Sequence, residues 1–178
     1  TGWMRILNSV EDSVLWLYEK NNKTTKNLKK EAMKFGINED RLVFATYMPI
    51  EEHLNRIKQA DLFIDTLPYN AHTTTSDALR MGLPVLTCMG NSFASRVAAS
   101  IISALNLPEL ITTNQEEYES LAIELATHPE KLKIIKDKLV SNLSTAPLYD
   151  TKLFTKNLES AYTMMYDRYH QGLDPDHI

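Results

Sequence analysis

Short apolar runs alternate with amphipathic segments along the first two thirds of the chain. The amphipathic segments predict helices over residues 3–10, 28–35, 51–59, 74–81 and 94–105. The apolar runs predict strands over residues 13–18, 41–45, 61–65, 84–87 and 110–111, and they are apolar throughout, as in strands covered on both faces. Strands that alternate with helices at this spacing are typical of βαβ units and a parallel sheet.

The last third of the chain carries helical patterns alone. Helices are expected over residues 116–126, 129–143 and 151–171, and Pro129 stands where proline favours a helix start. The polar stretch 19–27 is expected to be a loop, and Gly36 stands where a glycine often ends a helix. The expected fold is therefore one Rossmann-like α/β lobe over residues 1–178. A parallel sheet flanked by helices takes about residues 1–112, and a helical C-terminal region takes about 113–178.

Composition narrows the class of protein further. The chain has 178 residues, 43% of them hydrophobic and 24% charged, as in an ordinary globular domain. Its single cysteine, Cys88, excludes an internal disulfide framework and a cysteine-based zinc site. The net charge of -4 argues against general nucleic-acid binding. No apolar run reaches the length of a membrane span and no signal peptide opens the chain, so a cytoplasmic location is expected.

A polar cluster follows the third predicted strand, where ligands bind in open α/β sheets. Thr74 is the expected N-cap of the next helix, and Asp77 completes a capping-box-like pair three residues on. The first turn of that helix would offer free N–H groups, the positive end of the helix dipole and the hydroxyls of Thr73, Thr74 and Thr75. Such a turn suits a diphosphate. The alternative is that the threonines only cap the helix.

Other polar residues near this turn each have two interpretations. Asp77 either stabilises the helix dipole or accepts hydrogen bonds from ribose hydroxyls. His72 is a local hydrogen-bonding residue or part of the site. His53 and Arg56 share one face of the preceding helix, which is either a solvated face or a binding surface. Arg96, in the helix after the glycine-containing loop at residue 90, is expected to pair with Asp65 or Asp77, or else with a phosphate.

The ordered motifs of the chain resemble a known family, the O-linked N-acetylglucosamine transferases with their SPINDLY-like bacterial relatives, over essentially the whole chain. The motifs that carry the resemblance are DLFIDTLPYNAHTT at 61–74, SDAL at 76–79, GLPVLT at 82–87 and FASRVAAS at 93–100. Shorter matches are WMRIL at 3–7, SVLWL at 13–17, EEHL at 51–54, ELI at 109–111, PLYDTK at 147–152 and PDH at 175–177.

The resemblance implies the C-terminal, nucleotide-sugar-binding lobe of a GT-B glycosyltransferase. Such enzymes are inverting and independent of metal or other cofactors, and they transfer N-acetylglucosamine from UDP-N-acetylglucosamine to Ser or Thr of proteins. By motif, Thr73 and Thr74 would bind the diphosphate and stabilise it as the leaving group. Asp77 would bind the ribose, and His72 would shape the phosphate loop. His53 and Arg56 would lie along the uridine, and the backbone near Met48 would read the uracil.

The chain departs from the family pattern at two positions and in its extent. Ile50 stands where animal members have a ribose-contacting lysine, and Arg80 stands where many relatives have tryptophan. The resemblance further implies a fragment of a longer protein, whose other lobe and tetratricopeptide repeats would bind the acceptor protein. Alone, the chain is expected to transfer no sugar. Three alternatives stay open: a GDP-fucose-dependent transferase of the SPINDLY type, another GT-B-like enzyme such as an epimerase, and a non-catalytic nucleotide-binding or scaffold module.

Overall fold

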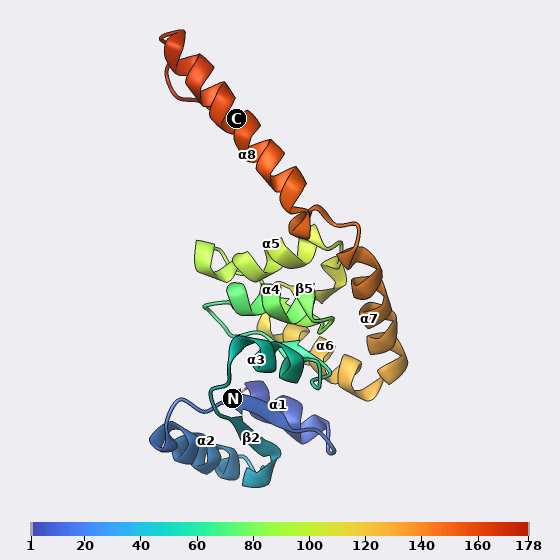
Figure 1. Cartoon of the computed structure of the whole chain (residues 1–178). Helices are drawn as coiled ribbons and strands as arrows, with labels where there is room; N and C mark the ends of the chain where they lie inside the picture. Colours follow the sequence, from blue (N-terminus) through green and yellow to red (C-terminus); the bar gives the residue numbers. More distant parts are fainter. Residues whose placement is uncertain (1, 178) are drawn as a thin grey trace.

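A computed structural model describes residues 2–177. Short strands alternate with helices up to residue 112, and helices alone follow (Figure 1). The first part contains α1 (Gly2–Ser9), β1 (Leu15–Tyr18), α2 (Asn22–Lys34), β2 (Leu42–Ala45), α3 (Ile50–Ile57), β3 (Phe63–Ile64), α4 (Thr73–Arg80), β4 (Val85–Cys88), α5 (Val97–Ala104) and β5 (Ile111–Thr112). The second part contains α6 (Gln115–Thr127), α7 (Pro129–Leu143) and α8 (Thr151–His170). Short 3-10 turns are η1 (Glu39–Arg41), η2 (Phe93–Ser95), η3 (Pro108–Leu110) and η4 (Pro147–Tyr149).

All the strand pairs are parallel, which confirms the predicted α/β class, but the strands pair in two groups. β1 pairs with β2, and β3, β4 and β5 form a three-stranded sheet with β4 in the centre. Every residue of β4 is buried, as expected of a strand covered on both faces. The carboxyl ends of parallel strands share one edge of a sheet, so the loops after β1 and β2 leave from one edge, and those after β3 and β4 leave from another common edge.

One predicted boundary in the N-terminal part needs correction. The stretch 19–27 was expected to be a loop, yet α2 already begins at Asn22, because the side chain of Asn21 accepts a hydrogen bond from the Thr24 N–H and caps the helix. The helix end was predicted correctly. Gly36 adopts φ 76°, and the Ile37 N–H bonds back to Ala32 O, as in helices that end on a left-handed glycine.

Apolar packing joins the two sheets. One cluster surrounds β4 and includes Leu79 of α4, Ile102 of α5 and Leu139 of α7, all fully buried. A second cluster gathers α1, α2, β1 and β2, and a third joins Ile6 of α1 to Tyr118 of α6. Helix α8 is different, because none of its residues is buried and it projects from the rest of the molecule (Figure 1).

Candidate functional site

The loop between β3 and α4 is organised around one buried carboxylate. Asp65, only 1% exposed, follows β3 directly. Its Oδ1 accepts hydrogen bonds from the N–H of Thr66 (2.8 Å) and of Ala71 (2.7 Å), and its Oδ2 accepts one from the hydroxyl of Thr87 (2.7 Å). The Tyr118 hydroxyl donates to its main-chain oxygen at 2.7 Å. Asp65 thus fixes both ends of the loop that leads into α4.

Burial and hydrogen bonds act on the charge of Asp65 in opposite directions. Loss of hydration raises the pKa of the Asp65 carboxyl above its usual range, and the three hydrogen bonds to the carboxylate only partly offset that rise. Sequence reasoning missed this residue as a site element. Its place in the sequence could have indicated its role, because a carboxylate at the carboxyl end of an apolar strand must either have buried hydrogen-bond partners or reach solvent.

Buried amide contacts hold the same loop against β4 and the loop that follows it. Asn70, 1% exposed, donates from Nδ2 to Thr66 O at 2.9 Å, and its N–H donates to Ala94 O at 2.9 Å. The His72 ring lies 3.4 Å from Ala94 O through Nε2. It also stacks on Tyr69, with ring centroids 5.2 Å apart. His72 therefore belongs to the wall of the loop.

The predicted N-cap of the next helix is wrong by two residues. His72 holds the N-cap position of α4 and makes no side-chain cap bond, and Thr73 and Thr74 already lie inside the helix. The buried hydroxyl of Thr75 donates back to Ala71 O at 2.9 Å, four residues earlier, as it does in a helix that has already begun before Thr74. Within residues 2–177, the N–H groups of Thr73, Thr74 and Thr75 have no acceptor. The helix start is left open to an anion.

Helix α4 also carries Asp77, which lies half-buried one turn further along. In the described part of the chain its carboxylate makes no hydrogen bond or ion pair, so it is free to accept hydrogen bonds from a ligand. Tyr149 steadies the helix from the C-terminal region by donating to Ser76 O at 2.9 Å. The guanidinium of Arg80 lies 5.8 Å from the Tyr149 ring, so this departure from the family pattern has a packing role.

Helix α3 brings His53 and Arg56 together and packs against α4 (Figure 1). Arg56 Nη2 lies 3.0 Å from His53 Nδ1, and its Nη1 donates to Thr46 O at 3.0 Å. The guanidinium also lies 5.6 Å from the Trp16 ring centroid, a cation–π distance. Its buried Nε has no acceptor among the described residues. His53 and Arg56 therefore contact each other beside the loop after β2 and do not form a solvated surface of separate charges.

Met48 and Ile50 flank the start of this helix. Met48 is half-buried in the loop between β2 and α3. Ile50, the first residue of α3, is 60% exposed, an unusual position for a large apolar side chain. The backbone of the Met48 loop is therefore presented at the carboxyl end of β2, next to Arg56.

The loop after β4 does not contain the ion pair predicted for Arg96. Arg96 is exposed and forms no ion pair within residues 2–177, and Asp65 is satisfied by neutral donors instead. This loop is held by its own hydroxyls, because Ser92 and Ser95 form a reciprocal capping box at η2. Gly90 lets the loop close, since a Cβ at that position would lie 2.5 Å from Ser95 Oγ.

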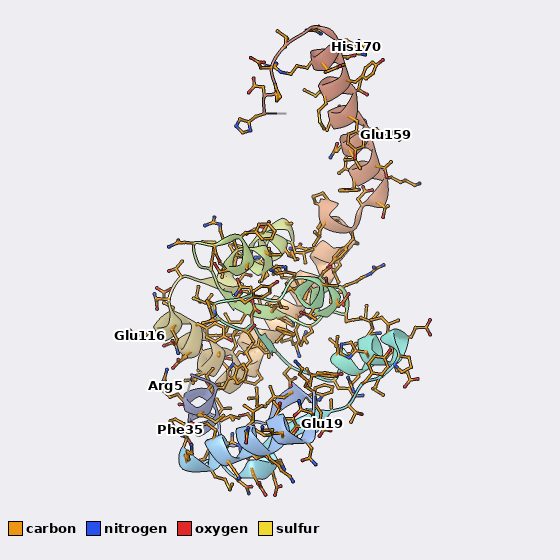
Figure 2. All side chains as sticks on the ribbon, turned by 90° about the vertical axis from the view of Figure 1, so that its left-hand side faces the viewer. Arg5, Glu19, Phe35, Glu116, Glu159 and His170 are labelled. Atoms are coloured by element: carbon orange, nitrogen blue, oxygen red, sulfur yellow. The ribbon has the colours of Figure 1, made fainter. Side chains whose placement is uncertain are left out.

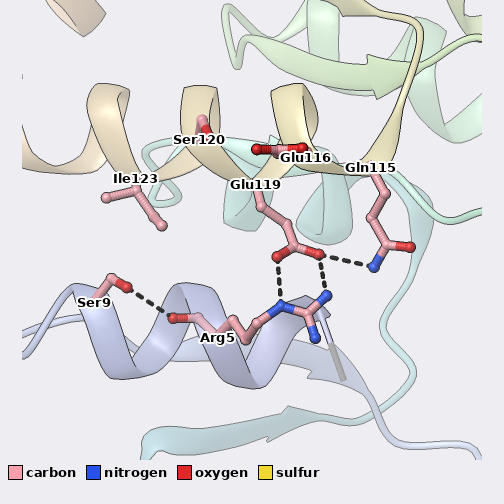
Figure 3. A pocket seen from close by; sticks show the side chains of 7 residues that line it. All are labelled: Arg5, Ser9, Gln115, Glu116, Glu119, Ser120 and Ile123. Atoms are coloured by element: carbon pink, nitrogen blue, oxygen red, sulfur yellow. Dashed lines mark hydrogen bonds and ion pairs between the residues drawn. The ribbon is translucent and has the colours of Figure 1, made fainter.

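A groove of about 490 Å³ between α1 and α6 lies apart from these residues (Figure 3). Arg5 makes two hydrogen bonds of 2.6 Å to the carboxylate of Glu119, and Gln115 donates to the same carboxylate at 2.8 Å. This pairing lowers the pKa of Glu119 and raises that of Arg5. Arg5 and Glu119 neutralise each other across the groove and hold α1 on α6, whereas Glu116, which also lines it, makes no ion pair among the described residues.

Within residues 2–177, no group of three or more His, Cys, Asp or Glu side chains is placed to hold a metal ion. None of the helices in that range is both long enough and apolar enough to cross a membrane.

Comparisons with known proteins agree with the family resemblance. The model of glycosyl transferase family 41 matches residues 1–158. A UDP-N-acetylglucosamine–peptide N-acetylglucosaminyltransferase of Caenorhabditis elegans is 35% identical over 99% of this chain and 15% of its own length. The probable enzyme SEC of Arabidopsis thaliana is 34% identical over 99% of this chain and 18% of its own length.

A solved structure supports the same assignment. A mutant of Thermobaculum terrenum O-GlcNAc transferase superposes with a TM-score of 0.86 at 31% identity, over 93% of this chain and 32% of its own. The chain thus spans less than a fifth of the length of the two relatives and about a third of that structure. By the matched family model and these relatives, the chain belongs to glycosyl transferase family 41.

Proposed function

We propose that this chain is the nucleotide-sugar-binding lobe of a protein O-N-acetylglucosaminyltransferase, with UDP-N-acetylglucosamine as the donor. The observation that carries the proposal is the uncapped start of α4. Its first turn, at the positive end of the helix dipole, holds three N–H groups that have no acceptor within residues 2–177, and the side chains of Thr73 and Thr74 there are exposed. Asp65 holds that turn in place through Ala71. A diphosphate is the part of the donor that this arrangement suits.

The nucleoside would extend from this turn toward α3. Asp77 would accept the ribose hydroxyls, and His53 and Arg56 would lie along the uridine. The backbone near Met48 would read the edge of the uracil. Support comes from the packing of α3 on α4 and from the Arg56–Thr46 hydrogen bond, which holds the Met48 loop beside this cluster.

In the proposed reaction, an acceptor Ser or Thr hydroxyl attacks the anomeric carbon from the face opposite the leaving group. The new carbon–oxygen bond forms as the bond to the β-phosphate oxygen breaks, and UDP leaves with the bonding electron pair. A base outside this chain would take the hydroxyl proton. The helix dipole and threonine hydroxyls would stabilise the charge that grows on the diphosphate, without help from a metal. Parts of the protein beyond this chain would bind the acceptor, and a cytoplasmic location fits the buried free Cys88.

Calorimetric titration of the chain with UDP and GDP tests the choice of donor. We expect UDP to bind about tenfold more tightly than GDP, the equivalent of one base-edge hydrogen bond.

The variant Asp77→Ala should weaken UDP binding by about ten- to hundredfold, because hydrogen bonds to a charged acceptor are strong. It should leave the fold intact, since Asp77 has no partner among the described residues. Tighter binding of GDP would favour the fucosyl donor, and equal UDP affinity in the variant would favour a scaffold.

Sugar transfer by the chain alone tests the proposed need for a second lobe. We expect no transfer to a protein acceptor above the uncatalysed background, because this lobe offers only leaving-group stabilisation. Radiolabelled UDP-N-acetylglucosamine and a Ser/Thr-containing acceptor protein provide the measurement, with the full-length enzyme as the positive control. Transfer by the purified 178-residue chain would show that a base and an acceptor site lie within it.

A further inference from the structure

Helix α2 carries a dense row of lysines on its outer face, and it lies at the end of the molecule opposite α8 (Figure 1). Between residues 19 and 35 there are six lysines and two glutamates, in a chain whose net charge is -4. The apolar residues Leu28 and Ala32 pack into the core around β1 and β2. The polar side of the helix therefore faces solvent, and Lys23, Lys26 and Lys30 are exposed. In Figure 2 the helix lies at the lower end of the molecule, between the labelled residues Glu19 and Phe35.

We call the shallow groove on this side the lysine face. Its lining residues are Asn22, Lys23, Lys26, Asn27 and Lys30. Within residues 2–177 its lysines form no ion pair, whereas Lys34, at the end of the helix, pairs with Glu31 at 2.7 Å. On α7, by contrast, Lys133, Lys136 and Lys138 each contact a carboxylate. The lysine face is therefore a concentration of uncompensated positive charge.

We propose that the lysine face binds an acidic, extended segment of another polypeptide. Lys23, Lys26 and Lys30 follow one another at about 4.5 and 6 Å along the helix axis. Side chains on one side of an extended peptide repeat about every 6.7 Å, so successive carboxylates reach successive lysines. The amides of Asn22 and Asn27 add neutral donors for the carbonyl groups of the peptide.

Other anionic partners fit the lysine face less well. An interfacial helix needs an apolar side to enter a bilayer, but the apolar side of α2 is packed in the core, and Met33, 51% exposed near its end, is a single apolar side chain rather than a side. Single-stranded nucleic acid is held by aromatic stacking as well as by charge, and the residues that line the groove are lysine and asparagine. Charge complementarity alone is sufficient for an acidic peptide, and the negative charge elsewhere would steer it here.

The position of the lysine face indicates which polypeptide this is. Helix α2 begins just after the carboxyl end of β1, and the Glu19 N–H bonds to Ala45 O at the end of β2. Asn22 and Lys23 therefore start at the same sheet edge as the proposed uridine site near Arg56. A peptide bound to the lysine face would continue toward the proposed donor site. The polypeptide that reaches the donor in a transferase is the acceptor, so we assign the acidic segment to the acceptor protein. This last assignment rests on the proposed function; the binding itself does not.

Fluorescence anisotropy with a labelled peptide of alternating glutamate and glycine tests the proposal at low ionic strength. The chain should bind it at least about tenfold more tightly than the glutamine–glycine peptide of equal length, and added salt should weaken the binding. The triple variant K23Q/K26Q/K30Q should lose about tenfold in affinity, the summed effect of three exposed charge pairs. Circular dichroism should be unchanged, because all three side chains are exposed.

The matched control is K133Q/K136Q/K138Q, which removes the same charge from α7 and should change the affinity less than about twofold. Equal affinity for the two peptides, or full affinity in the α2 variant, would overturn the proposal. So would tighter binding of phosphatidylserine vesicles or of an oligonucleotide than of the acidic peptide. UDP titration of the same samples separates the two claims: peptide binding without UDP binding contradicts only the proposed function, and the reverse contradicts only this inference.

Discussion

Replacing Asp65 by alanine is expected to lower the free energy of unfolding by about 3–5 kcal/mol, the largest stability change predicted for this chain. The alanine would leave the N–H groups of Thr66 and Ala71 and the hydroxyl of Thr87 without their acceptor, all close to a carboxylate that is 1% exposed. Each buried donor left unpaired costs about 1–3 kcal/mol, partly relieved if water enters the space. Urea unfolding followed by circular dichroism measures the loss.

The same substitution should weaken UDP binding although Asp65 itself would not touch the nucleotide. Ala71, which Asp65 holds at 2.7 Å, lies two residues before Thr73, so the start of α4 would lose its fixed position. We expect UDP affinity to fall by about tenfold in calorimetric titrations at a temperature where the variant is still folded. A variant that is destabilised as predicted yet binds UDP normally would show that the loop does not position the diphosphate.

Asp65→Asn separates the hydrogen bonds of this residue from its charge. The amide oxygen can still accept a hydrogen bond from the Ala71 N–H, so the loss in free energy of unfolding should stay within about 1 kcal/mol.

The charge of Asp65 makes stability depend on pH. Because burial raises the pKa of Asp65 in the folded chain, the folded state holds the proton more tightly than the unfolded state does. This contribution to stability is fully present below pH 3.8, the ordinary value, and is lost as pH rises through the raised pKa. The wild type should therefore gain stability relative to the variant as pH falls through that window, and urea titrations at several pH values should show it.

The sequence predicted the architecture because apolar periodicity reports directly on burial. Unbroken apolar runs such as residues 84–87 became buried parallel strands, and the long helix expected over residues 151–171 is α8. Boundaries set by side-chain hydrogen bonds were harder to predict. The start of α2 depends on Asn21 capping Thr24, and the lysines and threonines that follow carry no apolar signal. The start of α4 has no side-chain cap at His72, so no capping residue marks it in the sequence.

In the candidate site, hydrogen bonds between residues far apart in the chain were also not predicted from the sequence. Contacts that join residues far apart in the chain, such as Tyr118 to Asp65 and Thr87 to Asp65, follow from tertiary packing and leave no local pattern. Motif matching named the residues expected to meet the ligand, yet it did not find the buried carboxylate beneath them. The residues around Arg96 had predicted an ion pair to Asp65 or Asp77, because a lone charge in an apolar helix looks buried, whereas its side chain reaches solvent.

The double variant Thr73→Ala/Thr74→Ala is expected to lower sugar transfer by the full-length enzyme by about a hundredfold or more. Removing one donor that faces a developing negative charge typically costs about 10²–10³ in rate. UDP binding should fall less, by about tenfold, because the backbone N–H groups of α4 remain and the leaving-group charge is greatest in the transition state. Stability should change by less than about 0.5 kcal/mol, since both side chains are exposed and cap no helix. Steady-state kinetics and calorimetry on the same samples provide the comparison.

Two further variants distinguish an anion site from a simple helix start. Thr73→Ser/Thr74→Ser keeps both hydroxyls and should retain transfer within a few-fold of the wild type.

Thr74→Glu places a carboxylate in the first turn of α4, where the helix dipole makes a negative charge stabilising by about 0.3–1 kcal/mol. If the turn only begins a helix, this variant is a little more stable and binds UDP as before. If it holds the diphosphate, the added charge competes for the same N–H groups and repels the ligand, so stability is kept while UDP binding is lost. Unchanged UDP affinity in Thr74→Glu would therefore remove the central support for the proposed donor site.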